Sequence, residues 1–143
     1  LIGMPGCGKT SVGRLLAEKL HRPFFDADEV LTERYGDIPT IFRERGEDAF
    51  RAMETEILSE LGRRTGIVLA TGGGAVLHAD AMRALKKNAI VFYLDRPLQE
   101  IKKNMGGAER PLLRGDAKKL EELEETEKIR MPLSSLTEKN WMP

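Results

Sequence analysis

The sequence predicts an α/β fold in which helices cover both faces of a central parallel sheet, giving three layers, α/β/α. Short apolar runs at residues 67–70 and 89–94 lack alternating polar residues, as is typical of parallel strands that are buried on both faces. These runs alternate with segments whose apolar residues recur at helical spacing. The length of 143 residues suits a single domain, which we expect to span residues 1–143.

Helices are expected where apolar residues recur every three or four positions and where glycine or proline then ends the pattern. Pro23 follows the first such segment and Gly36 follows the second. Gly46 separates a short helix from the strongest amphipathic one. In chain order, the expected helices cover residues 9–20, 28–35, 38–42, 47–64, 80–87, 98–105 and 117–130.

The expected strands are short apolar runs that end at polar or turn-forming residues. The runs at 24–25, 67–70 and 89–94 end at an aspartate, at three glycines and at Asp-Arg-Pro, respectively. Only residues 1–2 precede the first glycine, where a buried strand of about five residues is expected. We therefore expect the sequence to begin partway through a strand.

Composition argues against several classes of partner. Lysine plus arginine and aspartate plus glutamate both total 23, so the formal net charge is zero and no general binding to nucleic acid is expected. No apolar run approaches the roughly 20 residues that span a membrane, so no membrane partner is expected. The single cysteine, Cys7, has no partner for an internal disulfide, and we expect a cytoplasmic protein.

The strongest motif is GMPGCGKT at residues 3–10, a complete G-x-x-x-x-G-K-T phosphate-binding loop. Glycines allow several backbone N–H groups to converge on phosphate oxygens, and the following helix directs its positive dipole end at them. We expect Lys9 to reach the β- and γ-phosphates and the Thr10 hydroxyl to bind Mg²⁺. A chance match is the alternative. Cys7 is expected to be a small loop residue, with a redox role as the alternative.

Asp26 and Asp28 follow the first complete strand. Ligands of parallel α/β sheets bind beyond the carboxyl ends of the strands. The two carboxylates are therefore candidates for a metal-bound water and a substrate hydroxyl. The alternative is that one of them, more readily Asp28, only caps the next helix.

Glu47, Arg51 and Glu54 are spaced by four and three residues, which places them on one stripe of the expected helix. An arginine held between two glutamates suits bidentate binding of a carboxylate. A surface ladder of ion pairs, which contributes little, is the alternative.

Two further segments are rich in glycine. Residues 72–74 are three glycines at the end of a strand, where a ligand can approach the backbone closely. A tight turn is the alternative. The loop at 106–115 carries Arg110, which can close over a phosphoryl group and stabilise its charge, or can be an exposed arginine.

These motifs, in this order, resemble those of the shikimate kinase family. The resemblance runs from Leu1 to about Pro132 and is carried by the segments GMPGCGKT, FFDADEVLTERYG, IFRERGEDAFRAMETE, ATGGGAV and ERPLL. It implies a P-loop fold like that of nucleoside monophosphate kinases. It also implies a monomer that uses ATP and Mg²⁺ to phosphorylate the 3-hydroxyl of shikimate.

The resemblance also implies roles for individual residues. Asp28 would orient the attacking hydroxyl or take its proton, and Asp26 would support Mg²⁺ through water. Lys9, Asp28 and Arg110 are then the catalytic residues. The ATP-binding residues would be Gly6, Cys7, Gly8, Lys9, Thr10, Ser11 and Arg110. The shikimate-binding residues would be Asp28, Phe42, Phe50, Arg51, Glu54, Gly72, Gly73, Gly74 and Arg130, with Arg51 and Arg130 on the carboxylate.

The last residues differ from the family pattern. Ser134 stands where the family usually has a tyrosine, and residues 135–143 (SLTEKNWMP) do not match the expected last strand and helix. Lys103 replaces a frequent arginine near the adenine. The domain is therefore expected to be truncated at both ends. A gluconate-type kinase, a nucleotide-binding module without turnover and a damaged gene product are the alternatives.

Overall fold

Alternating strands and helices make up the part of the chain that the computed structural model describes, residues 1–104. Most predicted elements are confirmed to within a few residues. Their bounds are α1 Lys9–Leu20, β1 Phe24–Asp26, α2 Ala27–Tyr35, α3 Ile38–Leu61, β2 Val68–Ala70, the 3₁₀ turn η1 Ala75–Leu77, α4 Ala79–Asn88 and α5 Leu98–Asn104. The helix predicted at 117–130 lies outside the described residues.

The extended segments lie parallel to one another, as the sequence predicts. β1 pairs with β2, with Asp26 opposite Ala70. Residues 1–2 continue the sheet on the other side of β2, where the N–H of Thr71 donates to the carbonyl of Leu1 at 3.0 Å. Ile2 then forms a parallel bridge with Tyr93. The order across the sheet is therefore β1, β2, residues 1–2 and the segment around Tyr93.

The segment at 89–94 differs from the prediction of a fully buried strand. Within residues 1–104, its contact with the sheet is one bridge, in which Ile2 donates to the carbonyl of Phe92 and accepts from the N–H of Leu94, both at 2.9 Å. Ile90 is 74% exposed and Phe92 38%. The apolar pattern thus predicted the location of the segment but not its burial.

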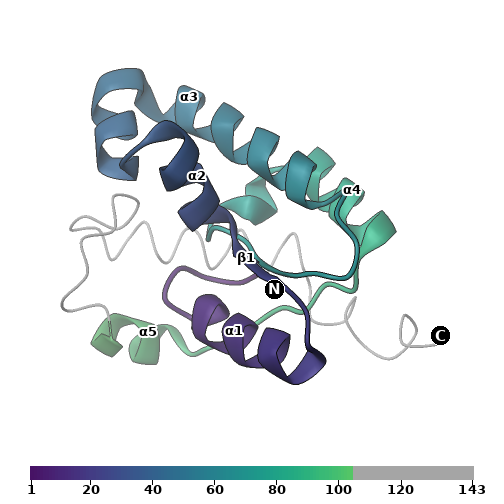
Figure 1. The fold of residues 1–143 in the computed structure, drawn as a ribbon. Helices are drawn as coiled ribbons and strands as arrows, with labels where there is room; N and C mark the ends of the chain where they lie inside the picture. The colour runs from purple at the N-terminus through teal and green to yellow at the C-terminus, as the bar shows by residue number, and fades with distance from the viewer. Residues whose placement is uncertain (105–143) are drawn as a thin grey trace.

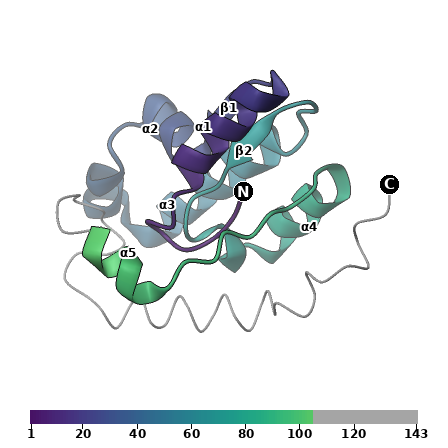
Figure 2. The same cartoon turned by 90° about the horizontal axis from the view of Figure 1, so that it is seen from below.

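Helices lie on both faces of the strands, which confirms the three layers. Figure 1 shows α2, α3 and α4 on one side of the sheet and α1 and α5 on the other. The view from below in Figure 2 shows α1 lying across β1 and β2. The carboxyl ends of β1 and β2, at Asp26 and Ala70, are thereby left at one edge of the layers, where the candidate site is built.

Gly46 divides α3 into two helices, as the sequence predicts. Its φ of 79° and ψ of 175° are not helical, and the positive φ requires glycine. The second helix ends at Leu61 rather than near residue 64. The kink changes the direction of the chain just before the segment that carries the Glu47–Arg51–Glu54 stripe.

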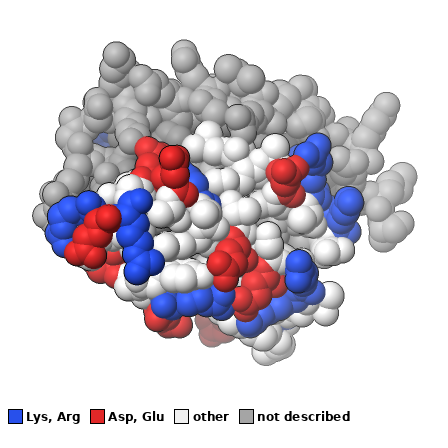
Figure 3. Space-filling view, turned by 90° about the horizontal axis from the view of Figure 1, so that it is seen from above, with Lys and Arg blue, Asp and Glu red and all other residues white. Residues whose placement is uncertain are grey.

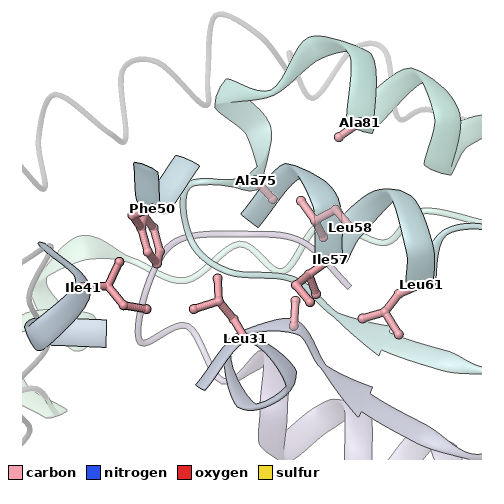
Figure 4. Packing of buried hydrophobic residues seen from close by; sticks show 9 residues of the cluster. Leu31, Ile41, Phe50, Ile57, Leu58, Leu61, Ala75 and Ala81 are labelled. Carbon is pink, nitrogen blue, oxygen red and sulfur yellow. The ribbon is translucent and has the colours of Figure 1, made fainter. Parts of the chain in front are cut away.

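A hydrophobic core fixes this second half of α3. Phe50, Ile57, Leu58 and Leu61 of α3 are each at most 1% exposed, and they pack with Leu31 of α2 (Figure 4). Burying one such side chain contributes about 2 kcal/mol. Because Phe50 immediately precedes the predicted carboxylate-binding arginine, the same packing sets the position of the candidate site.

Candidate active site

The phosphate loop, residues 3–10, joins the first sheet segment to α1. Gly3, Gly6 and Gly8 have φ values of 142°, 80° and 100°, a region that other residues rarely adopt. Gly8 precedes the first turn of α1, and no side chain caps the helix there. The backbone N–H groups of this turn are therefore directed into the loop, as anion binding requires.

Lys9 folds back over the phosphate loop. Its Nζ donates to the carbonyls of Gly3 and Met4 at 2.7 and 2.8 Å, and the residue is only 8% exposed. The positive charge therefore lies within the loop. Cys7 is buried against Met4 and Ile101, in keeping with the predicted role as a small loop residue.

Asp26 connects the phosphate loop to α2. One carboxylate oxygen accepts from the Thr10 hydroxyl at 2.5 Å and the other from the backbone N–H of Asp28 at 3.0 Å. Asp26 is therefore the residue that caps α2, whereas capping was expected only as the alternative role, and more readily for Asp28 than for Asp26. The strand ends one residue before the helix begins, so the residue at the junction is the one placed to cap.

The same contact fits a divalent cation. Thr10 and Asp26 bring a hydroxyl oxygen and a carboxylate oxygen together, and Mg²⁺ prefers such ligands. Within residues 1–104, no group of three or more histidine, cysteine, aspartate or glutamate side chains could hold a metal by itself. Mg²⁺ is usually held by one or two protein ligands together with phosphate oxygens and water, so these two residues are sufficient.

Arg51 lies between two glutamates, as the spacing predicts. Its Nη1 donates to Glu54 at 2.9 Å and its Nη2 to Glu47 at 3.2 Å. The arginine side chain is 16% exposed and Glu54 only 2%, so this is not a surface ladder of ion pairs. Each of these two bonds uses one N–H of a terminal nitrogen, and the guanidinium keeps further N–H groups for a ligand.

The triglycine turn, which we define as residues 72–74, follows β2 and touches the phosphate loop. A Cβ built on Gly73 would overlap the ring of Pro5. The φ values of the three glycines are not positive, so close approach, rather than backbone conformation, explains glycine here. The turn therefore lies directly against the phosphate loop.

The other two glycines of the turn face the predicted acceptor side. A Cβ on Gly72 would lie 2.7 Å from carboxylate oxygens of both Asp28 and Glu54, and a Cβ on Gly74 would overlap the guanidinium of Arg51. The turn thus brings the two carboxylates and the arginine to the place where it also meets the phosphate loop.

His78 and Thr55 join this group, and neither is predicted from the sequence. His78 Nε2 lies 2.8 Å from Glu54 Oε2, and its Nδ1 lies 3.2 Å from the Thr55 hydroxyl. We call Arg51, Glu54, Thr55 and His78 the Arg51 cluster. No motif includes His78, but it is one of only two histidines and follows the triglycine turn closely, which is the one signal that could have found it.

The two predicted aromatic residues contact each other, and one of them, Phe50, lies beside Arg51. The rings of Phe42 and Phe50 are 4.5 Å apart, and the Arg51 guanidinium lies 5.4 Å from the centre of the Phe50 ring. Phe50 is 1% exposed, so it supports the arginine from within the core. Arg110, Arg130 and the loop at 106–115 lie outside the described residues, and so does Ser134.

The surface charge follows the balanced composition. Figure 3 shows acidic and basic side chains interspersed over the face that α3 contributes to. The pair Arg34 and Glu60 is typical, with 2.7 Å between nitrogen and oxygen, and the hydrogen bond from Arg34 lowers the pKa of Glu60. In the part of the chain that the structure describes, no helix has the length and apolar character needed to cross a membrane.

Comparisons with known proteins agree with this geometry. The family model described as shikimate kinase matches residues 5–140. The shikimate kinase of Dechloromonas aromatica is 44% identical over 135 residues, which are 93% of this chain and 73% of that protein. The structure of the Acinetobacter baumannii enzyme in complex with shikimate is similar with a TM-score of 0.82 and 41% identity, over 94% of this chain and 76% of that one. The structure of the Aquifex aeolicus shikimate kinase is similar with a TM-score of 0.77 and 36% identity, over 90% of this chain and 79% of that one.

Proposed function

The chain belongs to the shikimate kinase family, and we propose that it transfers the γ-phosphoryl group of ATP to the 3-hydroxyl of shikimate, giving 3-phosphoshikimate and ADP. One observation carries this proposal. The triglycine turn touches Pro5 of the phosphate loop and also Asp28, Glu54 and Arg51. A phosphate donor and a hydroxylated acid bound at these two groups would therefore meet at the turn.

The phosphate loop holds the donor. Its backbone N–H groups and the N-terminus of α1 bind phosphate oxygens, and Lys9 compensates the negative charge that develops between the β- and γ-phosphates. Gly6, Cys7, Gly8, Thr10 and Ser11 complete the ATP-binding residues. The burial of Lys9 supports this role, because a charge that is shielded from water acts more strongly on a bound phosphate.

Asp28 and Arg51 act on the acceptor. Arg51 binds the shikimate carboxylate, and Asp28 orients the 3-hydroxyl so that its oxygen attacks the γ-phosphorus. The new O–P bond forms as the bond to the bridging oxygen of ADP breaks, and the hydroxyl proton passes to Asp28 or to water. Most of the rate acceleration then comes from positioning and from charge stabilisation.

Thr10 and Asp26 are the residues that would hold Mg²⁺, Thr10 through its hydroxyl and Asp26 through water. The ion would compensate charge on the β- and γ-phosphates. Their 2.5 Å contact supports this assignment, because it places two hard oxygen ligands beside the phosphate loop.

The remaining roles are assigned by resemblance and extend beyond the described residues. Arg110 closes over the phosphoryl group, and Arg130 is the second arginine on the carboxylate. Phe42 and Phe50 support the ring-binding side, and this is favoured by the contact between the two rings and by that between Phe50 and Arg51. A monomer in the cytoplasm completes the proposal. The lone buried cysteine suits a reducing compartment.

An ADP-release assay with a panel of hydroxylated acids tests the function. Shikimate should give acid-dependent ADP release at saturating ATP and Mg²⁺, and gluconate should give release near the background rate. Preference for gluconate would favour the gluconate-type alternative. ATP binding with no acid-dependent release would favour a nucleotide-binding module, and both results would contradict the proposal.

A further inference from the structure

His78 lies between η1 and α4, and both of its ring nitrogens contact α3. Nε2 is 2.8 Å from Glu54 Oε2 and Nδ1 is 3.2 Å from Thr55 Oγ1. The side chain is 15% exposed. The imidazole ring is therefore fixed at two points and cannot rotate without losing a hydrogen bond.

The Glu54 carboxylate depends on this histidine. Glu54 is 2% exposed, and its Oε2 accepts from Arg51 on one side and from His78 on the other. A buried carboxylate is costly unless its oxygens are hydrogen-bonded. Without His78, Arg51 would be the only partner in the cluster that compensates this charge.

The direction of the hydrogen bonds follows from the chemistry of the partners. An ionised carboxylate only accepts, so His78 Nε2 carries a hydrogen and donates to Glu54. The Thr55 hydroxyl lies 2.9 Å from the Arg51 carbonyl and 3.2 Å from His78 Nδ1, and it has one proton for the two acceptors. In either arrangement of that proton, the Nε2–H bond to Glu54 is retained.

We propose that His78 is a positioning residue for the acid substrate. By donating to Glu54 it holds that carboxylate in place, and Glu54 in turn holds the Arg51 guanidinium in the orientation that binds the substrate carboxylate. The inference rests on the proposed function, in which Arg51 binds shikimate. Among the described residues, the side-chain hydrogen bonds of His78 reach Glu54 and Thr55 and not the phosphate loop, so we expect its loss to weaken binding of the acid and not of ATP.

Two substitutions of His78 distinguish the effect of its hydrogen bond from the effect of its side-chain volume. His78→Leu removes the donor, whereas His78→Gln keeps an N–H near the place of Nε2. Steady-state kinetics should show a shikimate KM raised about tenfold in His78→Leu, with kcat and the ATP KM within about twofold of the wild type. His78→Gln should recover most of the loss. His21→Asn, at the exposed other histidine, is the matched control and should behave as the wild type.

Thr55→Val tests the second contact of the imidazole ring. It also keeps the inference testable if His78→Leu does not fold. Removing the hydroxyl should raise the shikimate KM about threefold and leave the ATP KM unchanged. The inference is overturned if the shikimate KM is unchanged in these variants, or if His78→Leu and His78→Gln both lower kcat and raise both KM values alike. A wild-type protein that fails to phosphorylate shikimate would instead overturn the proposed function.

Discussion

The phosphate loop and the Arg51 cluster are built in different ways. The loop is one continuous stretch of chain, and Lys9 bonds to carbonyls only five and six residues away. The cluster combines α3 with the residue before α4, and His78 lies 24 residues from Glu54 in sequence. A continuous site depends on local backbone conformation, whereas an assembled site depends on the packing that brings its parts together.

The largest expected effect lies in the phosphate loop. Lys9→Met removes the charge that is shielded within the loop, and kcat/KM should fall about 10³-fold whichever substrate is varied. The ADP-release assay measures this. Lys19→Met, at an exposed lysine in the last turn of α1, is the matched control and should retain activity. If Lys9→Met only raised the shikimate KM, this would contradict the role of Lys9 in binding the phosphate donor.

Arg51→Ala should weaken the binding of one substrate only, shikimate. Loss of a bidentate partner for the carboxylate should raise the shikimate KM about 50-fold, while the ATP KM should change by less than about twofold. Arg51→Lys should recover little, because an ammonium group does not reproduce the planar fork. Arg63→Ala, at an exposed position after α3, is the control. Equal effects on both KM values would refute the assignment of Arg51 to the carboxylate.

Gly73→Ala should disturb both regions at once. The added methyl group would overlap the ring of Pro5, so the turn or the loop must move. We expect both KM values to rise several-fold and the free energy of unfolding to fall by about 2 kcal/mol. Thermal unfolding and kinetics test this together. An unchanged ATP KM would show that the loop does not depend on the turn.

Gly46→Ala is the smallest expected change and is a control for Gly73→Ala. Its φ of 79° is unfavourable for alanine, but a Cβ there would meet no atom within 4 Å. The free energy of unfolding should fall by about 1 kcal/mol, with kinetics close to those of the wild type. Thermal unfolding measures the loss of stability. If its KM values changed as much as those of Gly73→Ala, a general loss of stability rather than the overlap with Pro5 would explain both.

The comparison of the two regions also explains what the sequence could predict. The phosphate loop is identifiable because its glycine spacing and Lys9 are required at fixed positions in one segment. Arg51 and Glu54 were found because helical spacing places neighbours on one stripe. His78 was missed because its partner is on another helix, and nothing in the sequence gives that distance.

Two other differences have local causes. Asp26 caps α2 because the strand passes directly into the helix, a boundary that the sequence pattern cannot fix to one residue. The apolar run at 89–94 predicts a buried strand, yet burial depends on the neighbours that the fold provides. Among the described residues, this segment joins the sheet through the bridge between Ile2 and Tyr93, and Ile90 and Phe92 stay exposed.

The contact between Gly73 and Pro5 has a consequence for binding thermodynamics. If shikimate shifts the triglycine turn, the Pro5 ring must shift with it, because there is no space between them. The affinity for ATP then changes by some factor when shikimate is bound. Linkage requires that ATP change the affinity for shikimate by the same factor. A single close contact between a glycine and a proline ring would therefore be enough to make the two binding equilibria interdependent.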